Sequence, residues 1–257
     1  MPLNPSNPTI TRPPPNAVVY DLSSPTQTTI TLPPNSTWTS GLHYHTTHTE
    51  YLRLLHGSIS LRLGTATTIL TAPPDGTGIE VTVPRGVRHE WRRADSPAVK
   101  QVDGDGDVVV VERTDPADGA KSVFFWNLNG AILDGGRGRG WWGAAWLTME
   151  LLIVFRALDN WPVFVDLGAF GGVGRALEAC VAHGVLGAAG AAGWLAGIQA
   201  VRRERMPGAL WEGWVGGWVG RESEPEPEPE PESSGGGGEE NPLDRKIGTV
   251  RCITSAV

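Results

Sequence analysis

The sequence predicts a mainly β fold, a sandwich or barrel of short strands, followed by a helical region. Short β-branched runs alternate with turn residues at intervals of roughly 8–12 residues between residues 17 and 113, which is typical of all-β domains. Two of these runs alternate apolar and polar residues, so each strand has an inner and an outer face. Beyond about residue 120, Ala, Gly and Trp accumulate in long stretches with apolar residues three or four apart, a spacing typical of helices.

Six runs are expected to form strands, and most end close to a turn that contains Gly or Pro. The clearest alternation places Ile59, Leu61 and Leu63 on one face of a strand, with Ser60 and Arg62 on the other. The six runs are Val18–Tyr20, Thr28–Leu32, Ser58–Leu63, Thr67–Leu70, Ile79–Val83 and Val108–Val111.

The helical region contains nine of the eleven tryptophans, within residues 122–220. Trp141–Leu158 is expected to form a helix and Asp166–Gly174 a break. Cys180–Val201 is long enough to span the ~30 Å core of a bilayer, although Ala and Gly make it only weakly hydrophobic. The region therefore either packs on the barrel as a helical subdomain or lies in a membrane interface. We prefer membrane association, because so much apolar surface outside a barrel needs a partner.

Changes in composition divide the chain into five parts. Residues 1–16 are expected to be an extended N-terminal arm, 17–120 the β-barrel, and 121–220 the helical, membrane-associated region. Residues 221–240 contain a Glu-Pro repeat and four consecutive glycines, so they are expected to be a disordered acidic linker. Residues 241–257 form a tail without a motif that we can interpret.

Charge and cysteine content exclude some classes of function. The net charge is −7, but eight glutamates in residues 222–240 leave the remainder at about +1 and without a basic stripe. Nucleic acid is therefore not an expected partner. The two cysteines, Cys180 and Cys252, build no disulfide framework, and the Pro-rich N-terminus has no apolar signal segment. We expect an intracellular, cytoplasmic protein that is not secreted.

Three histidines and one glutamate are spaced as ligands of one metal ion. His43 and His45 are two residues apart, so on a strand both side chains point to the same face. A turn near residues 46–49 would bring Glu50 beside them, and His89 follows a second turn. Imidazole and carboxylate suit a divalent ion of Fe, Mn, Zn, Ni or Cu, of which we prefer Fe. A lone pair of surface histidines is the alternative, but the additional Glu50 and His89 make it a poor explanation.

Residues 41–93 resemble a cupin, because both halves of the cupin motif are present. The halves are His43-x-His45-x4-Glu50-x6-Gly57 and Gly78-x5-Pro84-x-Gly86-x2-His89. The resemblance implies a double-stranded β-helix, or jelly-roll barrel, with a metal bound by His43, His45, Glu50 and His89. It also implies a homodimer as a candidate assembly. Arg93 departs from the pattern, since cupins commonly have Asn at that position, which is usually not a ligand.

A less specific resemblance extends to residues 17–165. The segment Val123–Gly130, followed by an apolar helix, is similar to the C-terminal part of fungal cupin-domain oxidoreductases from polyketide biosynthetic clusters. It implies a role in secondary metabolite biosynthesis with a small, apolar polyketide intermediate as the substrate.

Three further residues are candidates for contact with the substrate. Trp38 and Trp91 could form an aromatic wall, although simple core packing is the alternative. Arg93 is our candidate for a catalytic and substrate-binding residue, because its guanidinium could orient an oxygen of the substrate; an ion pair with a neighbouring strand is the alternative. His48 and His56 are expected at the surface.

Three functions follow from these observations. The first is a metal-dependent oxidoreductase in which substrate and dioxygen use open metal positions. The second is a redox-neutral isomerase, cyclase or dehydratase in which the metal acts only as a Lewis acid. The third is a non-catalytic cupin that holds a small ligand and recruits partners or a membrane surface through its helices.

Overall fold

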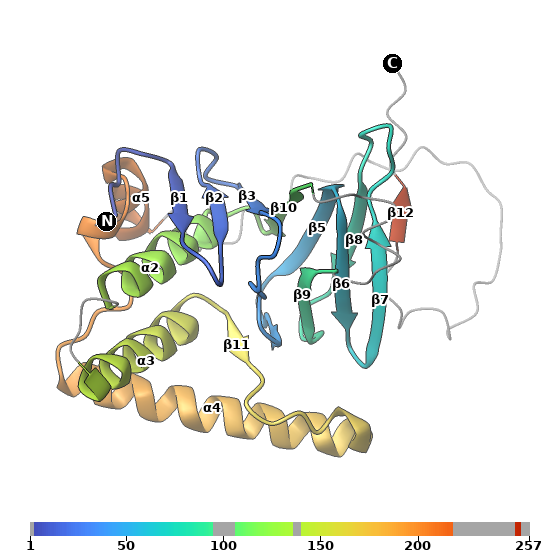
Figure 1. Ribbon diagram of the computed structural model, residues 1–257. Coiled ribbons are helices and arrows are strands. Elements are labelled where there is room, and N and C mark those ends of the chain that lie inside the picture. Colours follow the sequence, from blue (N-terminus) through green and yellow to red (C-terminus); the bar gives the residue numbers. More distant parts are fainter. Residues whose placement is uncertain (1–2, 95–105, 136–139, 218–249, 253–257) are drawn as a thin grey trace, which may run out of the picture.

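The computed structural model describes residues 3–94, 106–135, 140–217 and 250–252, and shows two antiparallel sheets beside a layer of helices (Figure 1). The larger sheet has seven strands in the order β1-β2-β3-β10-β5-β8-β12. Its strands are β1 (Thr9–Arg12), β2 (Val18–Asp21), β3 (Gln27–Leu32), β10 (Val108–Asp115), β5 (Thr49–His56), β8 (Ile79–Val83) and β12 (Val250–Cys252).

The smaller sheet has five strands in the order β11-β4-β9-β6-β7. They are β11 (Trp161–Pro162), β4 (His43–Tyr44), β9 (His89–Arg93), β6 (Ser58–Leu63) and β7 (Ala66–Thr71). Between β4 and β10 the chain passes from one sheet to the other at five of its six steps, and the β6–β7 hairpin is the one step that stays within a sheet. The mainly β jelly-roll fold that the sequence predicts is therefore confirmed.

Side chains from the facing strands fill the space between the two sheets. The inward residues Glu50, Leu52 and Leu54 of β5 are buried, as are His89 and Trp91 of β9. This alternation follows from the two-residue period of a strand, which sends every second side chain into the core. All six predicted strands are present, and Ser58–Leu63 and Ile79–Val83 have the predicted bounds.

Among the residues that the structure describes, four α-helices lie beside the barrel. They are α2 (Ala120–Gly135), α3 (Gly140–Ala157), α4 (Gly171–Leu195) and α5 (Gly208–Gly216). The predicted helix Trp141–Leu158 corresponds to α3, and the predicted break corresponds to the short 3-10 helix Gly168–Phe170. The segment Val123–Gly130, which we expected to precede a helix, lies inside α2. Phe125 of this segment packs against Tyr20 of β2, with ring centroids 5.1 Å apart.

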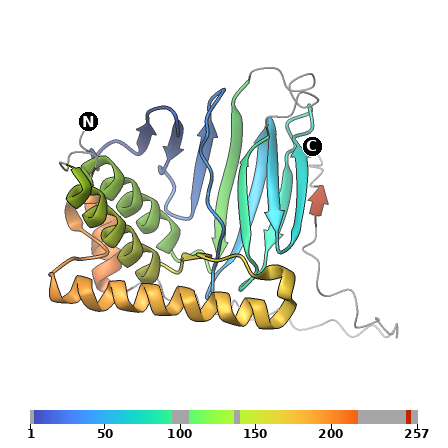
Figure 2. The same ribbon diagram turned by 60° about the horizontal axis from the view of Figure 1, so that its bottom comes forward.

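Helix α4 runs along one side of the molecule, under both the other helices and the barrel (Figure 2). Its inner face contacts α3 so closely at Gly190 and Gly193 that a Cβ there would collide with Arg156 and Ile153. Its outer face exposes Val173, Leu177, Val181 and Val185, which we call the α4 outer face. The segment Gly168–Leu195 is long and apolar enough to cross a membrane by length and composition alone, and 28% of its most apolar window is buried inside the protein.

The chain termini extend the larger sheet at both edges. Residues 9–12 of the expected N-terminal arm form β1 and pair with β2, in the register Thr9 to Asp21. At the other edge, β12 pairs with β8. The acidic linker expected in residues 221–240 lies outside the described residues.

Candidate metal centre

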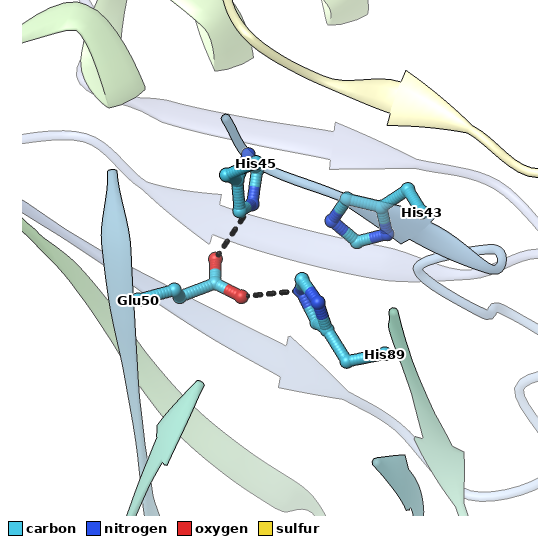
Figure 3. A group of neighbouring side chains, drawn as sticks. All are labelled: His43, His45, Glu50 and His89. Atoms are coloured by element: carbon cyan, nitrogen blue, oxygen red, sulfur yellow. Dashed lines mark ion pairs between the residues drawn. The ribbon is translucent and has the colours of Figure 1, made fainter. Parts of the chain in front are cut away.

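The four residues predicted as ligands meet inside one end of the barrel (Figure 3). His43 lies on β4 directly opposite His89 of β9, His45 follows β4, and Glu50 lies near the start of β5. One ligand atom from each residue lies within 4.8 Å of the others, and all four side chains are buried. Both sheets therefore contribute to the cluster, as the spacing of the motif requires.

A main-chain carbonyl orients each of the three imidazoles. The Nδ1 atoms of His43, His45 and His89 lie 2.8, 2.6 and 3.2 Å from the carbonyl oxygens of Gly41, Asp159 and Val87. Because a carbonyl oxygen only accepts hydrogen bonds, each Nδ1 must carry the proton in the neutral ring. The remaining nitrogen, Nε2, then has a free lone pair, which is the form that binds a metal.

The Nε2 atoms and the carboxylate of Glu50 are therefore all hydrogen-bond acceptors, and no proton lies between them to form a hydrogen bond. Nε2 of His89 lies 2.6 Å from Oε2 of Glu50, and Nε2 of His45 lies 3.8 Å from Oε1. Neither Nε2 has a hydrogen-bonding partner. Burial lowers the pKa of His89 to about 4 and the pKa values of His43 and His45 well below 6.5, so the rings are neutral at neutral pH. Buried acceptors that face one another are destabilising unless a cation lies between them.

Three antiparallel strands that alternate between two facing sheets, with inward His and Glu ligands at one end, define the architecture. The barrel has the cupin fold. This conclusion rests on the strand order and on the register that places His43 opposite His89.

Solved cupin structures resemble part of this chain. A predicted oxalate decarboxylase from Thermotoga maritima matches with 16% identity and a TM-score of 0.30, over 44% of this chain and 97% of that one. The Cnp3 cupin domain of Schizosaccharomyces pombe matches with 14% identity and a TM-score of 0.26, over 44% and 66%. CapF from Staphylococcus aureus matches with 17% identity and a TM-score of 0.30, over 42% and 28%. No family model and no curated protein matches the chain.

Coverage differs among the similar structures. The match spans 60% of a provisionally assigned sugar phosphate isomerase from Acidithiobacillus ferrooxidans and 30% of CapF crystallised with an inhibitor.

Helix α2 places a lysine against the candidate metal ligands of the cupin barrel. Nζ of Lys121 contacts Oε1 of Glu50 and lies 2.9 Å from Oε2 of Glu112, a buried residue of β10. The other oxygen of Glu112 accepts a hydrogen bond of 2.8 Å from the indole nitrogen of Trp91. Burial lowers the pKa of Lys121 to about 7 and raises the pKa of Glu112 to about 7.

A second cluster ties the cupin barrel to the end of α3. The carboxylate of Asp159 accepts hydrogen bonds from the amides and hydroxyls of Thr46 and Thr47, at 2.6 to 2.9 Å. His48 lies between Asp159 and Asp118, at 3.0 and 3.1 Å. We call these five residues the Asp159 cluster. The expectation of an exposed His48 is wrong, because two carboxylates from outside the motif enclose its ring. Burial alone would lower the pKa of His48, but these two hydrogen bonds raise it to about 9.

A cavity of about 20 Å³ lies between the cupin barrel and the helices, next to the ligands. That volume holds about one water molecule. Its lining combines polar and apolar side chains: His45, His48, Thr114, Ala120, Lys121, Phe124, Leu158 and Asn160. A substrate that reaches the ligands from this side therefore passes between α2 and the segment that follows α3.

Trp38 and Trp91 lie in the barrel core and do not line this cavity. Their ring centroids are 4.8 Å apart, and both side chains are buried. The indole nitrogen of Trp38 donates to the hydroxyl of Tyr20 at 2.9 Å, while that of Trp91 donates to Glu112. The alternative of core packing accounts for these contacts, and the predicted aromatic wall for a substrate has no support from them.

Arg93 points into the protein but away from the ligands. It lies four residues beyond His89 on β9, a distance of about 13 Å along a strand. Its guanidinium donates to the carbonyl oxygens of Leu32 and Gly106, at 3.3 and 2.8 Å. The prediction that Arg93 orients a substrate at the metal is therefore not supported by its position. The structure gathers the four predicted ligands in one cluster, and none of the three predicted substrate residues lines the cavity beside that cluster.

Sequence reasoning missed Lys121, Glu112 and Asp159. Lys121 could have been noticed, because a cation in the first turn of an otherwise apolar helix is opposed by the helix dipole. Glu112 could also have been noticed, because it is the one charged residue on the inward face of a Val-rich strand. Asp159 gave no such signal, since its position depends on how α3 packs.

Proposed function

We propose that this protein is a metal-dependent enzyme whose cupin barrel holds one divalent ion. The observation that carries the proposal is the set of three imidazoles, each oriented by a main-chain carbonyl, around the carboxylate of Glu50. Buried, neutral imidazoles that direct lone pairs at a buried carboxylate fit a metal ion far better than they fit a solvent-free core.

The ligand set defines the chemistry that such an ion would supply. A divalent ion held by His43, His45, Glu50 and His89 would polarise a substrate oxygen and, if it were Fe, Mn or Cu, would also exchange electrons. The protein itself would exclude bulk water through Phe124 and Leu158, which line the approach. Lys121 and Glu112 would hold or move a proton next to the reacting group.

The more specific proposal is an oxidoreductase that acts on a polyketide intermediate in fungal secondary metabolism. Its support is the sequence resemblance together with a ligand set that suits Fe. The cavity of about 20 Å³ admits only the end of such a substrate, so the remainder would lie between α2 and the Leu158–Asn160 segment. A substrate larger than water requires these elements to separate.

A redox-neutral enzyme is the second candidate, and one observation favours it. The pair of Lys121 and Glu112 places a group that can give or accept a proton directly beside Glu50. Proton transfer near a polarised oxygen is what an isomerase or dehydratase needs, and it does not require dioxygen.

Two measurements on one pair of strains test these functions. The metabolites that accumulate with and without the intact gene identify the substrate, and metal analysis of the purified protein identifies the ion. Turnover of the accumulated compound is then followed with and without dioxygen. An oxidoreductase that uses dioxygen stops under strict anaerobiosis, whereas a redox-neutral enzyme continues. Identical metabolite profiles for the wild type and a variant without all four ligands would instead favour a binding protein.

We further propose an intracellular protein that associates with a membrane surface. The α4 outer face supports this, because the one exposed charge of α4 is that of Arg175, while Glu178 is buried against Arg88 at 2.6 Å. An apolar face with a positive edge suits an anionic bilayer better than it suits water. A homodimer is the alternative way to cover this surface.

A further inference from the structure

Lys121 holds a positive charge in contact with a ligand of the candidate metal centre. Its side chain is 9% exposed, and its ammonium lies between Glu50 and Glu112. It also lies over the ring of Phe125, with Nζ 5.6 Å from the centroid. Three separate contacts therefore fix this ammonium at the inner end of the approach to the ligands.

The position of Lys121 is unfavourable for the fold alone. It is the second residue of α2, where the helix dipole opposes a cation. Burial of an ammonium adds a larger cost unless carboxylates offset it. An apolar side chain of similar length would avoid both costs, so the stability of α2 does not explain a lysine here.

The charges around the candidate metal centre give a better reason for a lysine at position 121. In the described structure the carboxylates of Glu50 and Glu112 balance Lys121 with one negative charge in excess. A divalent ion among the ligands would reverse the sign and leave one positive charge in excess. A buried site with an unbalanced charge is costly, and a bound monoanion would restore neutrality.

The cavity next to the candidate ligands is where such an anion would bind. Lys121 and His45 line the same cavity, so a group that enters it meets the ammonium and the metal ligands together. Thr114, opposite Glu50 on the neighbouring strand, adds a hydroxyl to the lining. An oxyanion in this cavity would accept a charged hydrogen bond from Lys121 beside the residues that would hold the ion.

We propose that Lys121 is a substrate-binding residue and that the substrate is an oxyanion, such as a carboxylate, enolate or phenolate. This inference rests on the proposed metal-dependent function and narrows its substrate class. With Glu50 holding the ion, Lys121 would no longer be paired with this carboxylate, and its ammonium would bind the substrate.

The test uses the full chain loaded with Co(II), whose visible spectrum reports a new ligand. Formate is the anionic probe, and formamide is its neutral counterpart of similar size. Both are titrated at constant ionic strength into the wild type, Lys121→Met and Lys121→Gln. The control is Arg113→Met, which removes a cation from the outward face of β10. Co(II) content and thermal unfolding are measured for every variant.

The wild type and Arg113→Met should bind formate with the same dissociation constant. Loss of the charged hydrogen bond should weaken formate binding about tenfold or more in both Lys121 variants, with Co(II) content unchanged. Formamide should bind weakly to all four proteins. Equal formate affinity in the wild type and the Lys121 variants would overturn the inference, as would loss of Co(II) from those variants. A wild type that binds no Co(II) would instead overturn the metal-dependent function itself.

Discussion

The carbonyl oxygen of Asp159 accepts a hydrogen bond of 2.6 Å from Nδ1 of His45, although the two residues are 114 positions apart in the sequence. The helical region therefore completes the orientation of a candidate metal ligand in the cupin barrel. The side chain of the same residue binds the turn between His45 and Glu50 through Thr46 and Thr47. Barrel and helices form one site, and damage to the contact between them should be detectable at the metal.

Asp159→Ala should weaken metal binding without the loss of any ligand. The substitution keeps the main-chain carbonyl that accepts from His45 but leaves the amides of Thr46 and Thr47 and one side of His48 without their acceptor. The turn after His45 is then no longer held against residue 159, so this carbonyl orients the ring of His45 less firmly. Loss of a group that hydrogen-bonds to a metal ligand typically weakens metal affinity 10–100-fold, and we expect a loss of about tenfold here. The free energy of unfolding should fall by about 0.5–1.5 kcal/mol, because the exposed donors of Thr46 and Thr47 can bind water in place of the carboxylate.

Isothermal titration with Zn(II) and urea unfolding measure the two effects. Asp166→Asn is the matched control, since Asp166 is an exposed acidic residue of the same region, which pairs with Arg62 and with the buried Arg88. Its metal affinity should equal that of the wild type. An Asp159→Ala protein with unchanged metal affinity would show that the side chain of Asp159 is not needed to orient His45.

Gly57→Ala should destabilise the barrel more than Gly64→Ala does. Both glycines have positive φ, 75° and 63°, so Ala strains the backbone by a similar amount at each position, about 1 kcal/mol. At Gly57 a Cβ would also lie 2.7 Å from Cγ2 of Val108, whereas nothing lies within 4 Å at Gly64. We expect an additional loss of about 1–3 kcal/mol at Gly57. Urea unfolding of both variants measures the difference, and equal losses would contradict this account of the motif glycine.

Leu177→Asp should reduce binding to anionic vesicles if the α4 outer face lies on a membrane. The substitution introduces a charge where about half of the leucine surface is exposed, so the fold should tolerate it. Co-sedimentation with vesicles that contain phosphatidylglycerol measures binding. Ile69→Asp is the control, because Ile69 is equally exposed on β7 of the barrel. Two outcomes would contradict membrane binding by the α4 outer face. One is equal vesicle binding by the two variants, and the other is a wild-type dimer that does not bind vesicles.

Local patterns were sufficient to predict the barrel and the ligand set. The two-residue period of strands such as Ile79–Val83 is short-range information, and so is the spacing of His43, His45 and Glu50. The positions of Trp91 and Arg93 on the inner face of β9 were also predictable. Their partners were not, because Glu112, Leu32 and Gly106 come from other parts of the chain.

The lining of the approach depends on tertiary packing. Lys121 reaches Glu50 only because α2 starts where it does after β10, and Asp159 reaches His45 only because α3 packs beside the barrel. Neither arrangement has a periodic signature. An inward charge such as Glu112 was the available clue, because a buried carboxylate implies a buried partner.

The metal content of the purified chain tests the central claim most directly. We predict about one divalent ion per chain in the wild type and in His56→Ala, which removes an exposed histidine at the end of β5. Glu50→Gln and His45→Ala should lose the ion. Metal at a hundredfold excess over its dissociation constant should stabilise the wild type by about 2.7 kcal/mol relative to chelator-treated protein. A wild type that binds none of Fe, Mn, Zn, Ni and Cu, and that none of them stabilises, would contradict the account.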